Sequence, residues 1–184
     1  MVVSNVTANP DSSLQPIKLT CEYQVNPLGI DTKKPRLSWI FQSTERNQFQ
    51  TAYEIIVSSH QESINQLKGD TWSTGKISSR VNLHIEYSGE PLESFTRYYW
   101  RVRVYDKNNI VSEWSNPVWF ETAMLEATDW KSRWIGDGSK QFDRDEDFYK
   151  EDRMPLFRKV FTVKKKISSA RLYIAGMGDR KSVV

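Results

Sequence analysis

Six carboxylates within ten residues form the densest set of chemically capable side chains in the sequence. They are Asp143, Asp145, Glu146, Asp147, Glu151 and Asp152. Hydrolysis by paired carboxyl groups requires two of them on a rigid scaffold, roughly 5–10 Å apart and with separated pKa values. Residues 137–152 are rich in Gly, Asp and Glu and lack apolar periodicity, so we expect a solvated, mobile insertion. The cluster does not predict a catalytic pair.

Metal-binding and nucleophilic patterns are not recognisable either. The acidic cluster lacks the fixed ligand spacing and the glycine of an EF-hand loop. Cys21 stands alone, so it offers neither a disulfide nor a cysteine pair for zinc, and we expect a small buried hydrophobe. His60 and His84 lack triad or zinc-protease context and are expected at the surface or a strand edge. We therefore predict no catalytic residue, no metal site and no cofactor in this chain.

Aromatic residues offer the one binding hypothesis, since the chain contains seven Trp and eight Tyr. Four of them would make an exposed platform for sugar rings if they shared one face: Trp72, Tyr99, Tyr105 and Trp119. Packing in a core or between domains is the favoured interpretation, because large aromatic rings dominate such contacts. No ligand-binding residue is assigned.

A second group of residues is expected to hold the fold together. These structural residues are Trp39, Tyr98, Trp100, Arg101, Arg103 and Trp114. Trp114 follows the segment that carries Arg101 and Arg103, so a guanidinium can stack on its indole, a contact that contributes about 0.5–2 kcal/mol. Alternating side chains around Trp39, Tyr98 and Trp100 are expected to fill the space between two sheets and to leave no reactive cleft.

Short strand-like segments recur along the first two thirds of the chain. Stretches rich in β-branched and aromatic residues are separated by turn formers about every ten residues, which is typical of a sandwich. Residues 97–106 alternate strictly between an apolar and a polar or aromatic face, and residues 59–69 leave room for one helical turn. The expected strands are Ile17–Tyr23, Arg36–Phe41, Ala52–Ser58, Thr71–Ser73, His84–Glu86, Arg97–Asp106 and Val118–Thr122.

Length and composition fit one full domain and part of a second. The chain has 184 residues, and domains cluster at roughly 100–150. Its net charge of +3 comes from basic residues that are scattered along the sequence, so no nucleic-acid partner is expected. No apolar run approaches the ~20 residues of a spanning helix, and the first residues lack the features of a signal peptide. We expect no membrane partner, and the compartment stays open.

A change of pattern near residue 125 predicts a domain boundary. We expect a sandwich in residues 1–124, a linker and acidic loop in residues 125–154, and the first strands of a second β-domain in residues 155–184. Strands are expected at Leu156–Val163 and Ala170–Ala175. Two strands do not form a stable sheet alone, so this segment should cover the sandwich or pair with another molecule, because exposed edges seek hydrogen bonds.

Two features resemble markers of the fibronectin type III fold. Leu92 is followed six positions later by Tyr98, as in the corner of that fold, where the tyrosine hydroxyl caps a backbone group. Trp39 matches the core tryptophan of its second strand. The resemblance implies an all-β, immunoglobulin-like sandwich and says nothing of function.

A longer series of motifs resembles the N-terminal region of bacterial α-L-rhamnosidases, glycoside hydrolase family 78. It covers nearly the whole chain. The motifs are Asn26–Asp31, Pro35–Trp39, Tyr53–Ile55, Tyr99–Val102, Trp114–Ser115, Trp130–Gly136, Phe157–Phe161 and Ala170–Gly176.

This resemblance implies a non-catalytic accessory module, which packs against and positions the downstream domains of a parent enzyme that removes terminal α-L-rhamnose. In that family a jelly-roll domain follows, sometimes a rhamnose-binding one, and an (α/α)₆ barrel supplies the acidic catalytic residues. Weak carbohydrate contact is a further option, and the parent would be periplasmic, secreted or cytoplasmic. Residues 177–184 depart from the family pattern, which we interpret as truncation or a frameshifted end.

Two other classes remain open. Trp114-Ser115 before the last strand is also found in adhesion and receptor sandwiches, whose paired version would need a second Trp-Ser where Ile110-Val111 stands. The paired cysteines of such receptors are missing from this sequence as well. A free-standing carbohydrate-binding module would show measurable sugar binding.

Overall fold

The computed structural model describes residues 14–136, 138, 146, 156–167 and 170–174. The chain divides into two units, residues 1–132 and residues 133–184. The strands and helices named below all lie in the first unit.

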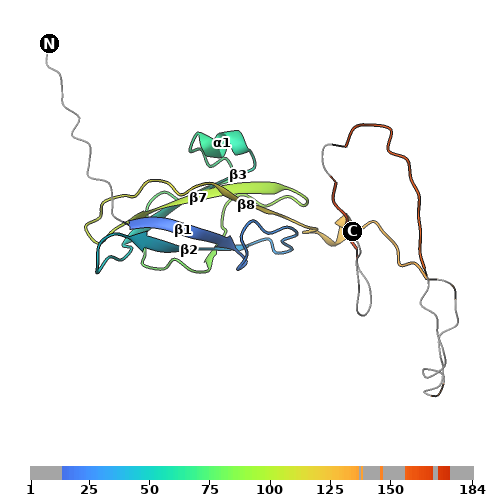
Figure 1. The fold of residues 1–184 in the computed structure, drawn as a ribbon, viewed down its shortest axis with the longest axis horizontal. Helices are drawn as coiled ribbons and strands as arrows, with labels where there is room; N and C mark the ends of the chain where they lie inside the picture. Colours follow the sequence, from blue (N-terminus) through green and yellow to red (C-terminus); the bar gives the residue numbers. More distant parts are fainter. Residues whose placement is uncertain (1–13, 137, 139–145, 147–155, 168–169, 175–184) are drawn as a thin grey trace, which may run out of the picture. The chain divides into compact units, whose positions relative to one another are not determined.

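Two antiparallel sheets form the first unit. A three-stranded sheet has the order β1-β2-β6, and a larger sheet has the order β4-β3-β7-β8, with β5 pairing to the same edge of β3 as β4. Figure 1 shows β3, β7 and β8 in one layer and β1 and β2 in the other. The strands are β1 (Leu14–Cys21), β2 (Arg36–Ser43), β3 (Ala52–Ser58), β4 (Trp72–Ser73), β5 (Ile77–Ser78), β6 (Ile85–Glu86), β7 (Arg97–Tyr105) and β8 (Val118–Glu121).

The predicted all-β, immunoglobulin-like sandwich is confirmed. The bounds of β3 agree with the prediction, and most other strands differ from it by one to three residues at an end. One end differs for a clear reason: Glu22 and Tyr23, expected in the first strand, instead form a turn in which Cys21 and Gln24 exchange backbone hydrogen bonds of 2.9 and 3.0 Å. The short β5 was not predicted, because two residues carry no periodic signal.

Strand β7 organises the larger sheet. Its side chains alternate strictly between half-buried and buried. Tyr98, Trp100, Val102 and Val104 point toward the other sheet, and each is at most 2% exposed. The strand pairs with β3 from Ala52↔Tyr105 to Ser58↔Tyr99 and with β8 on its other side. The period-two pattern in the sequence therefore becomes one core face and one outer face.

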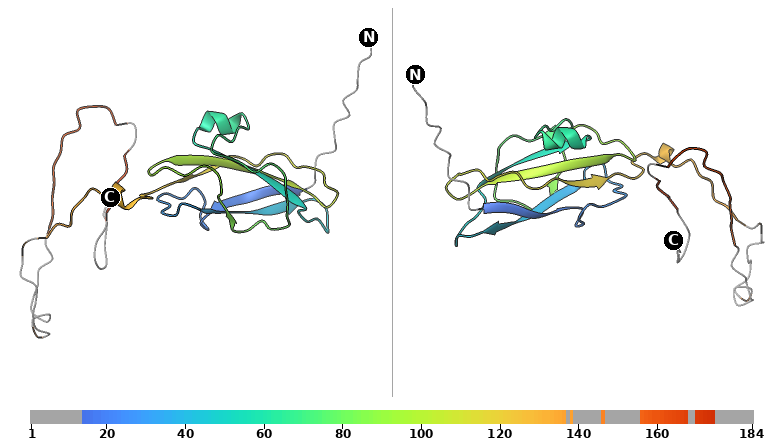
Figure 2. Two further views of the ribbon diagram at one scale, coloured as in Figure 1. Left: turned by 180° about the vertical axis from the view of Figure 1, so that it is seen from behind. Right: turned by 45° about the horizontal axis from the view of Figure 1, so that its top comes forward.

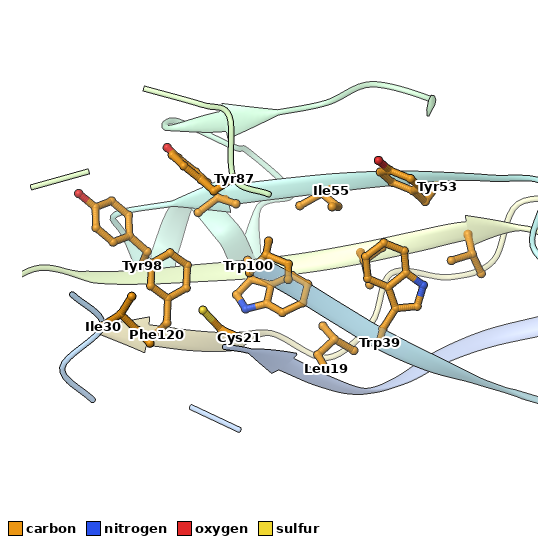
Figure 3. Packing of buried hydrophobic residues seen from close by; sticks show 14 of the residues in the cluster. Leu19, Cys21, Ile30, Trp39, Tyr53, Ile55, Tyr87, Tyr98, Trp100 and Phe120 are labelled. Carbon is orange, nitrogen blue, oxygen red and sulfur yellow. The ribbon is translucent and has the colours of Figure 1, made fainter. Parts of the chain in front are cut away.

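Aromatic rings fill the space between the sheets, as Figure 3 shows. Trp39 and Trp100 are fully buried. The Trp39 ring meets Tyr53 edge to face at 5.3 Å between centroids, and Tyr98 stacks on Phe120 at 5.5 Å. Burial of large apolar side chains stabilises each by roughly 1.5–3 kcal/mol, so this layer holds the two sheets together.

One buried amide supports the core tryptophan. Gln50 is 1% exposed, and its Oε1 accepts a 3.0 Å hydrogen bond from Nε1 of Trp39. Its Nε2 donates to the carbonyl oxygens of Ser79 and Val81 at 3.0 and 2.9 Å. Because each polar atom of this amide has a partner, its burial costs little, and the segment that follows β5 is fixed to β2.

A short helix covers part of the outer face of the larger sheet. Helix α1 (Gln61–Asn65) lies on the side of β3 and β7 that faces away from β1 and β2, in both views of Figure 2. Ile64 is fully buried, although it does not belong to the cluster between the sheets. Residues 59–69 therefore contain the helical turn for which the sequence left room.

The two strands expected in the second unit are not formed in its described residues. Residues 156–163 and 170–174 belong to no strand, and Leu156 and Leu172 are 95% and 84% exposed. A strand needs a neighbour with which to exchange backbone hydrogen bonds, so apolar content alone was an insufficient signal. Ala175 lies outside the described residues. That the segment covers the sandwich or pairs with another molecule stays a prediction.

Tyr98 is the strongest local test of the fold. Its hydroxyl accepts a 2.8 Å hydrogen bond from the backbone N–H of Glu93, as the resemblance to the fibronectin type III corner implied. Tyr98→Phe should lower the free energy of unfolding by about 1–2 kcal/mol, because that N–H loses its partner. Tyr99→Phe, on the half-buried outer face, should change it by less than about 0.5 kcal/mol. Urea denaturation measures both, and equal losses would contradict the assignment.

Candidate functional site

A loop between β1 and β2 forms hydrogen bonds with strand β8. Oδ1 of Asn26 accepts a 3.0 Å hydrogen bond from the backbone N–H of Trp119. The N–H of Glu121 donates to the Pro27 carbonyl at 3.0 Å, and Ile30 exchanges bonds of 2.9 and 2.7 Å with Glu121 and Ala123. Residues 26–30 thus cover the free edge of β8, an edge that otherwise invites pairing with other chains.

Glycine and asparagine give this loop its shape. Asn26 has φ 51° and Gly29 has φ 78°, the left-handed region that these residue types tolerate best. Pro27 is buried and Ile30 is 7% exposed, so the loop is packed onto the sandwich. The Asn26–Asp31 motif therefore carries a physical task, which is to guide the chain as it leaves β8.

Thr122 connects the exit of β8 to the corner before β7. The residue is fully buried. Its hydroxyl donates to the Glu93 carbonyl at 2.6 Å and accepts from the Thr96 N–H at 2.9 Å, while its own N–H donates to the Thr96 carbonyl at 2.9 Å. One side chain thus joins two segments that are 26 residues or more apart in sequence.

The residues that follow β8 are also attached to the sandwich. Ser94 Oγ accepts a 2.9 Å bond from the Leu125 N–H and donates to Oδ2 of Asp129. The same Oδ2 accepts from the Glu126 N–H at 3.1 Å, which caps the 3₁₀ turn η1 (Ala127–Asp129). We call residues 26–30, 93–96 and 122–129 the exit anchor. Its hydrogen bonds attach the residues that follow β8 to the sandwich.

Electrostatics favour the same arrangement. The hydrogen bond from Ser94 and those from the Glu126 and Leu125 N–H groups lower the pKa of Asp129, so its carboxylate stays ionised as a cap. Lys33 pairs with Glu126, but both side chains are more than half exposed, at 62% and 60%, so this ion pair adds little. The buried hydroxyls and backbone groups contribute most.

The outer face of the larger sheet carries a ladder of cations on aromatic rings. Cζ of Arg97 lies 4.0 Å from the centroid of Trp119, and Cζ of Arg103 lies 4.8 Å from that of Trp114. Arg97 also pairs with Glu121 at 2.9 Å, and Arg103 with Glu54 at 2.8 Å. The stacking expected of Trp114 therefore occurs with Arg103. Arg101 faces the same side, and its buried Nε has no hydrogen-bond partner in the described part of the chain.

Two serines attach the Trp114 segment to β7. Oγ of Ser112 accepts from the Val104 N–H at 3.0 Å, and Oγ of Ser115 accepts from the Val102 N–H at 3.1 Å. Their own N–H groups donate to the carbonyls of the same two valines at 2.8 and 2.9 Å. Each serine thus supplies both halves of a strand-like pair and places Trp114 beside Arg103.

The aromatic platform suggested by the sequence is not assembled. Tyr99 and Trp119 face each other across β7 and β8, but Trp72 packs against the core, edge to face with Tyr87 at 5.1 Å. Tyr105 hydrogen-bonds to Glu54, and Nζ of Lys76 lies 3.9 Å from its ring centroid. Pattern alone did not separate the faces, because Trp72 belongs to a two-residue strand.

The other candidate groups do not converge. His60 precedes α1 and contacts Asp70 at 3.2 Å, whereas His84 lies beside Tyr23, and both histidines are exposed. Cys21 is buried as expected, and burial raises its pKa to about 12. Glu146 is exposed, and the other five acidic residues lie outside the described ranges. Among the described residues, no three His, Cys, Asp or Glu side chains gather to hold a metal ion.

Several residues of the exit anchor were not found from the sequence. Ser94 and Thr122 act through partners more than 25 residues away, and nothing local marks them. Asn26 and Gly29 did carry a signal, since both are turn formers inside a recognised motif. That signal indicated a loop and gave no sign that the loop pairs with β8.

The family model for the Rha78A-like, N-terminal immunoglobulin domain matches residues 16–126, which contain all of the sandwich except the first two residues of β1, and most of the exit anchor. The chain belongs to this family. The match ends where the anchor passes into η1.

Relatives of this immunoglobulin domain are parts of much longer proteins. An alpha-L-rhamnosidase of Formosa agariphila is 31% identical over 91% of this chain and 19% of its own length. The structure of an alpha-L-rhamnosidase from Dictyoglumus thermophilum matches with a TM-score of 0.66 and 41% identity, over 70% of this chain and 14% of that one. The crystal structure of the Streptomyces avermitilis alpha-L-rhamnosidase in complex with L-rhamnose matches with a TM-score of 0.63 and 38% identity. The match covers 67% of this chain and 12% of that one.

The chain therefore spans less than a fifth of the length of these relatives. Its homologues are alpha-L-rhamnosidases, and it corresponds to their N-terminal immunoglobulin-like domain. Within the residues that the structure describes, no helix has the length and apolar character needed to cross a membrane.

The exit anchor can be loosened by a single change. Ser94→Ala removes the acceptor of the Leu125 N–H and the donor to Asp129. Exchange of the Leu125 amide hydrogen should become roughly 3–10-fold faster, because the free energy of local opening falls by about 1 kcal/mol. The core amide of Val102 should keep its protection. Hydrogen exchange followed by NMR measures both sites.

Ser88→Ala is the matched control, because Ser88 is exposed and lies outside the anchor. It should leave Leu125 unchanged. Equal exchange rates at Leu125 in Ser94→Ala and in the unmodified chain would show that the serine does not hold the exit.

Proposed function

We propose that this domain is a non-catalytic accessory module of an α-L-rhamnosidase, a glycoside hydrolase that removes terminal α-L-rhamnose. It packs against the downstream jelly-roll and (α/α)₆-barrel domains and positions them. The exit anchor is the observation that carries this proposal. A module that only occupied space would not need a buried threonine, a serine and a left-handed loop to hold the chain after its last strand.

The chemistry of the sandwich supports a positioning role. The space between the sheets is filled by aromatic rings, and four ionisable groups of the outer face form two ion pairs, Arg97 with Glu121 and Arg103 with Glu54. Hydrolysis of a glycosidic bond needs two carboxyl groups that face one substrate. Glu22, Glu54 and Glu121 are instead paired with guanidinium groups, and Asp129 caps a turn.

The adhesion and receptor alternative gains some support from the Ser112–Ser115 segment and its stack with Arg103. The relatives weigh against it, since the same domain occurs within alpha-L-rhamnosidases. A module that anchors the chain at its exit is more useful inside a longer polypeptide than at the end of a receptor.

Activity assays separate the accessory role from catalysis. The 184-residue chain should release no p-nitrophenol from p-nitrophenyl α-L-rhamnoside above the buffer rate, whereas the product of the complete gene should. Release by the pure chain would overturn the non-catalytic assignment. A complete gene product that is inactive on rhamnosides but active on another glycoside would overturn the substrate assignment.

The positioning role is tested in the complete enzyme. Ser94→Ala/Asp129→Ala should lower the midpoint of thermal inactivation by roughly 2–4 °C for each kcal/mol lost at the anchor. At 25 °C, kcat/KM should stay within about twofold, because neither residue is expected to touch the substrate. Ser88→Ala should change neither quantity. An unchanged inactivation midpoint in the double variant would refute the positioning role.

A further inference from the structure

The turn at the end of β1 has a backbone that its residues do not favour. Glu22 and Tyr23, the two central residues, have φ 45° and 65°. A two-residue hairpin turn with both central residues left-handed strongly prefers Asn-Gly. Neither Glu nor Tyr is a residue of that kind, so the turn is strained. Such strain persists where surrounding contacts enforce it, and it is concentrated at binding sites.

The strained turn presents an aromatic ring to solvent. Tyr23 is 67% exposed. Its ring meets His84 edge to face, with centroids 5.2 Å apart, and Cζ of Arg36 lies 5.1 Å from its centroid. His84 also has a left-handed backbone, with φ 57°, and its N–H donates to Oγ of Ser38 at 3.0 Å. Two strained residues from different segments therefore hold one exposed aromatic pair.

An ion pair between Glu22 and Arg36 holds the Arg36 guanidinium beside the ring. Oε2 of Glu22 accepts a 2.6 Å bond from Nη2 of Arg36, and Oε1 accepts from Nε at 3.1 Å and from the backbone N–H of Arg36 at 2.7 Å. The hydrogen bonds from Arg36 lower the pKa of Glu22, so the carboxylate remains an acceptor. Both side chains are held in place before any ligand arrives.

A polar hollow adjoins the turn. Its volume is about 580 Å³, within the range of roughly 300–1,000 Å³ typical of small-molecule sites. Both chain neighbours of Tyr23, Glu22 and Gln24, line it, so the turn borders the hollow. Its polar lining includes Glu22, Gln24, Asp31, Lys34, Arg36 and Glu86.

We propose that this corner binds one neutral sugar unit, a terminal α-L-rhamnosyl group, with its ring against Tyr23 and its hydroxyls on Glu22, Arg36 and Gln24. The lining carries both signs of charge and offers donors and acceptors side by side, which suits vicinal hydroxyls better than a polyanion. A flat aromatic face suits the C–H groups of a sugar ring. The choice of rhamnose rests on the proposed function.

Titration of the 184-residue chain tests the proposal directly. Methyl α-L-rhamnopyranoside should produce saturable NMR shifts, in the millimolar range, at the amides of Glu22–Gln24, Thr32–Lys34 and Arg36. Methyl α-D-glucopyranoside should bind at least fivefold more weakly. Absence of saturation with the rhamnoside, or equal binding of the glucoside, would overturn the assignment.

Tyr23→Gly separates a ligand role from a structural one. Glycine adopts the left-handed turn without strain, so the variant should unfold at a higher temperature than the unmodified chain. Its affinity for the rhamnoside should nevertheless fall at least tenfold. A variant that binds as well as the unmodified chain would refute the role of the ring.

Leu67→Gly is the matched control, because Leu67 is an exposed apolar residue with φ 59° far from the corner in sequence. It should gain stability in the same way and keep full affinity. Binding is measured on this chain alone, so its failure leaves the anchoring role intact. Conversely, a complete enzyme without rhamnosidase activity would refute the proposed function, while saturable binding of the rhamnoside to this chain could still be observed.

Discussion

Strict alternation along β7 is the constraint on which the rest of the structure depends. Because successive side chains of a strand point to opposite faces, Tyr98, Trp100, Val102 and Val104 all enter the space between the sheets. A register slip of one residue would bury the arginines and expose the tryptophan. Antiparallel pairing with β3 over seven positions and with β8 over four fixes that register. The core and the outer ladder are therefore two consequences of one pattern.

The same strand determines where the chain leaves the sandwich. Its first residues follow the corner at residues 93–96, and the Tyr98 hydroxyl ties the Glu93 N–H to the strand. Thr122 then bonds to that corner from the end of β8. The direction of the exit thus depends on hydrogen bonds that are rooted in the core. These hydrogen bonds attach residues 122–129 to the sandwich.

Local patterns predicted what local interactions decide. The bounds of β3 and the faces of β7 were predictable from β-branched and aromatic alternation between turn formers. The Tyr98 contact was implied by the resemblance of Leu92 and Tyr98 to the fibronectin type III corner. Ser94, Thr122 and Gln50 were not predictable, because their partners lie far away in sequence. The turn at residues 22–23 was missed for a related reason, since Glu and Tyr carry no turn signal.

The failed prediction of a strand in residues 156–163 shows that local composition alone does not suffice. Their apolar side chains resemble those of β3, yet β3 has neighbours on both edges and this segment pairs with none among the described residues. Pairing therefore decides between strand and extended chain where composition does not. The exit anchor shows the converse case, in which available partners produce pairing without a strand-like sequence. Residues 26–30 have little strand character, but the open edge of β8 gives them hydrogen-bond partners, and they pair.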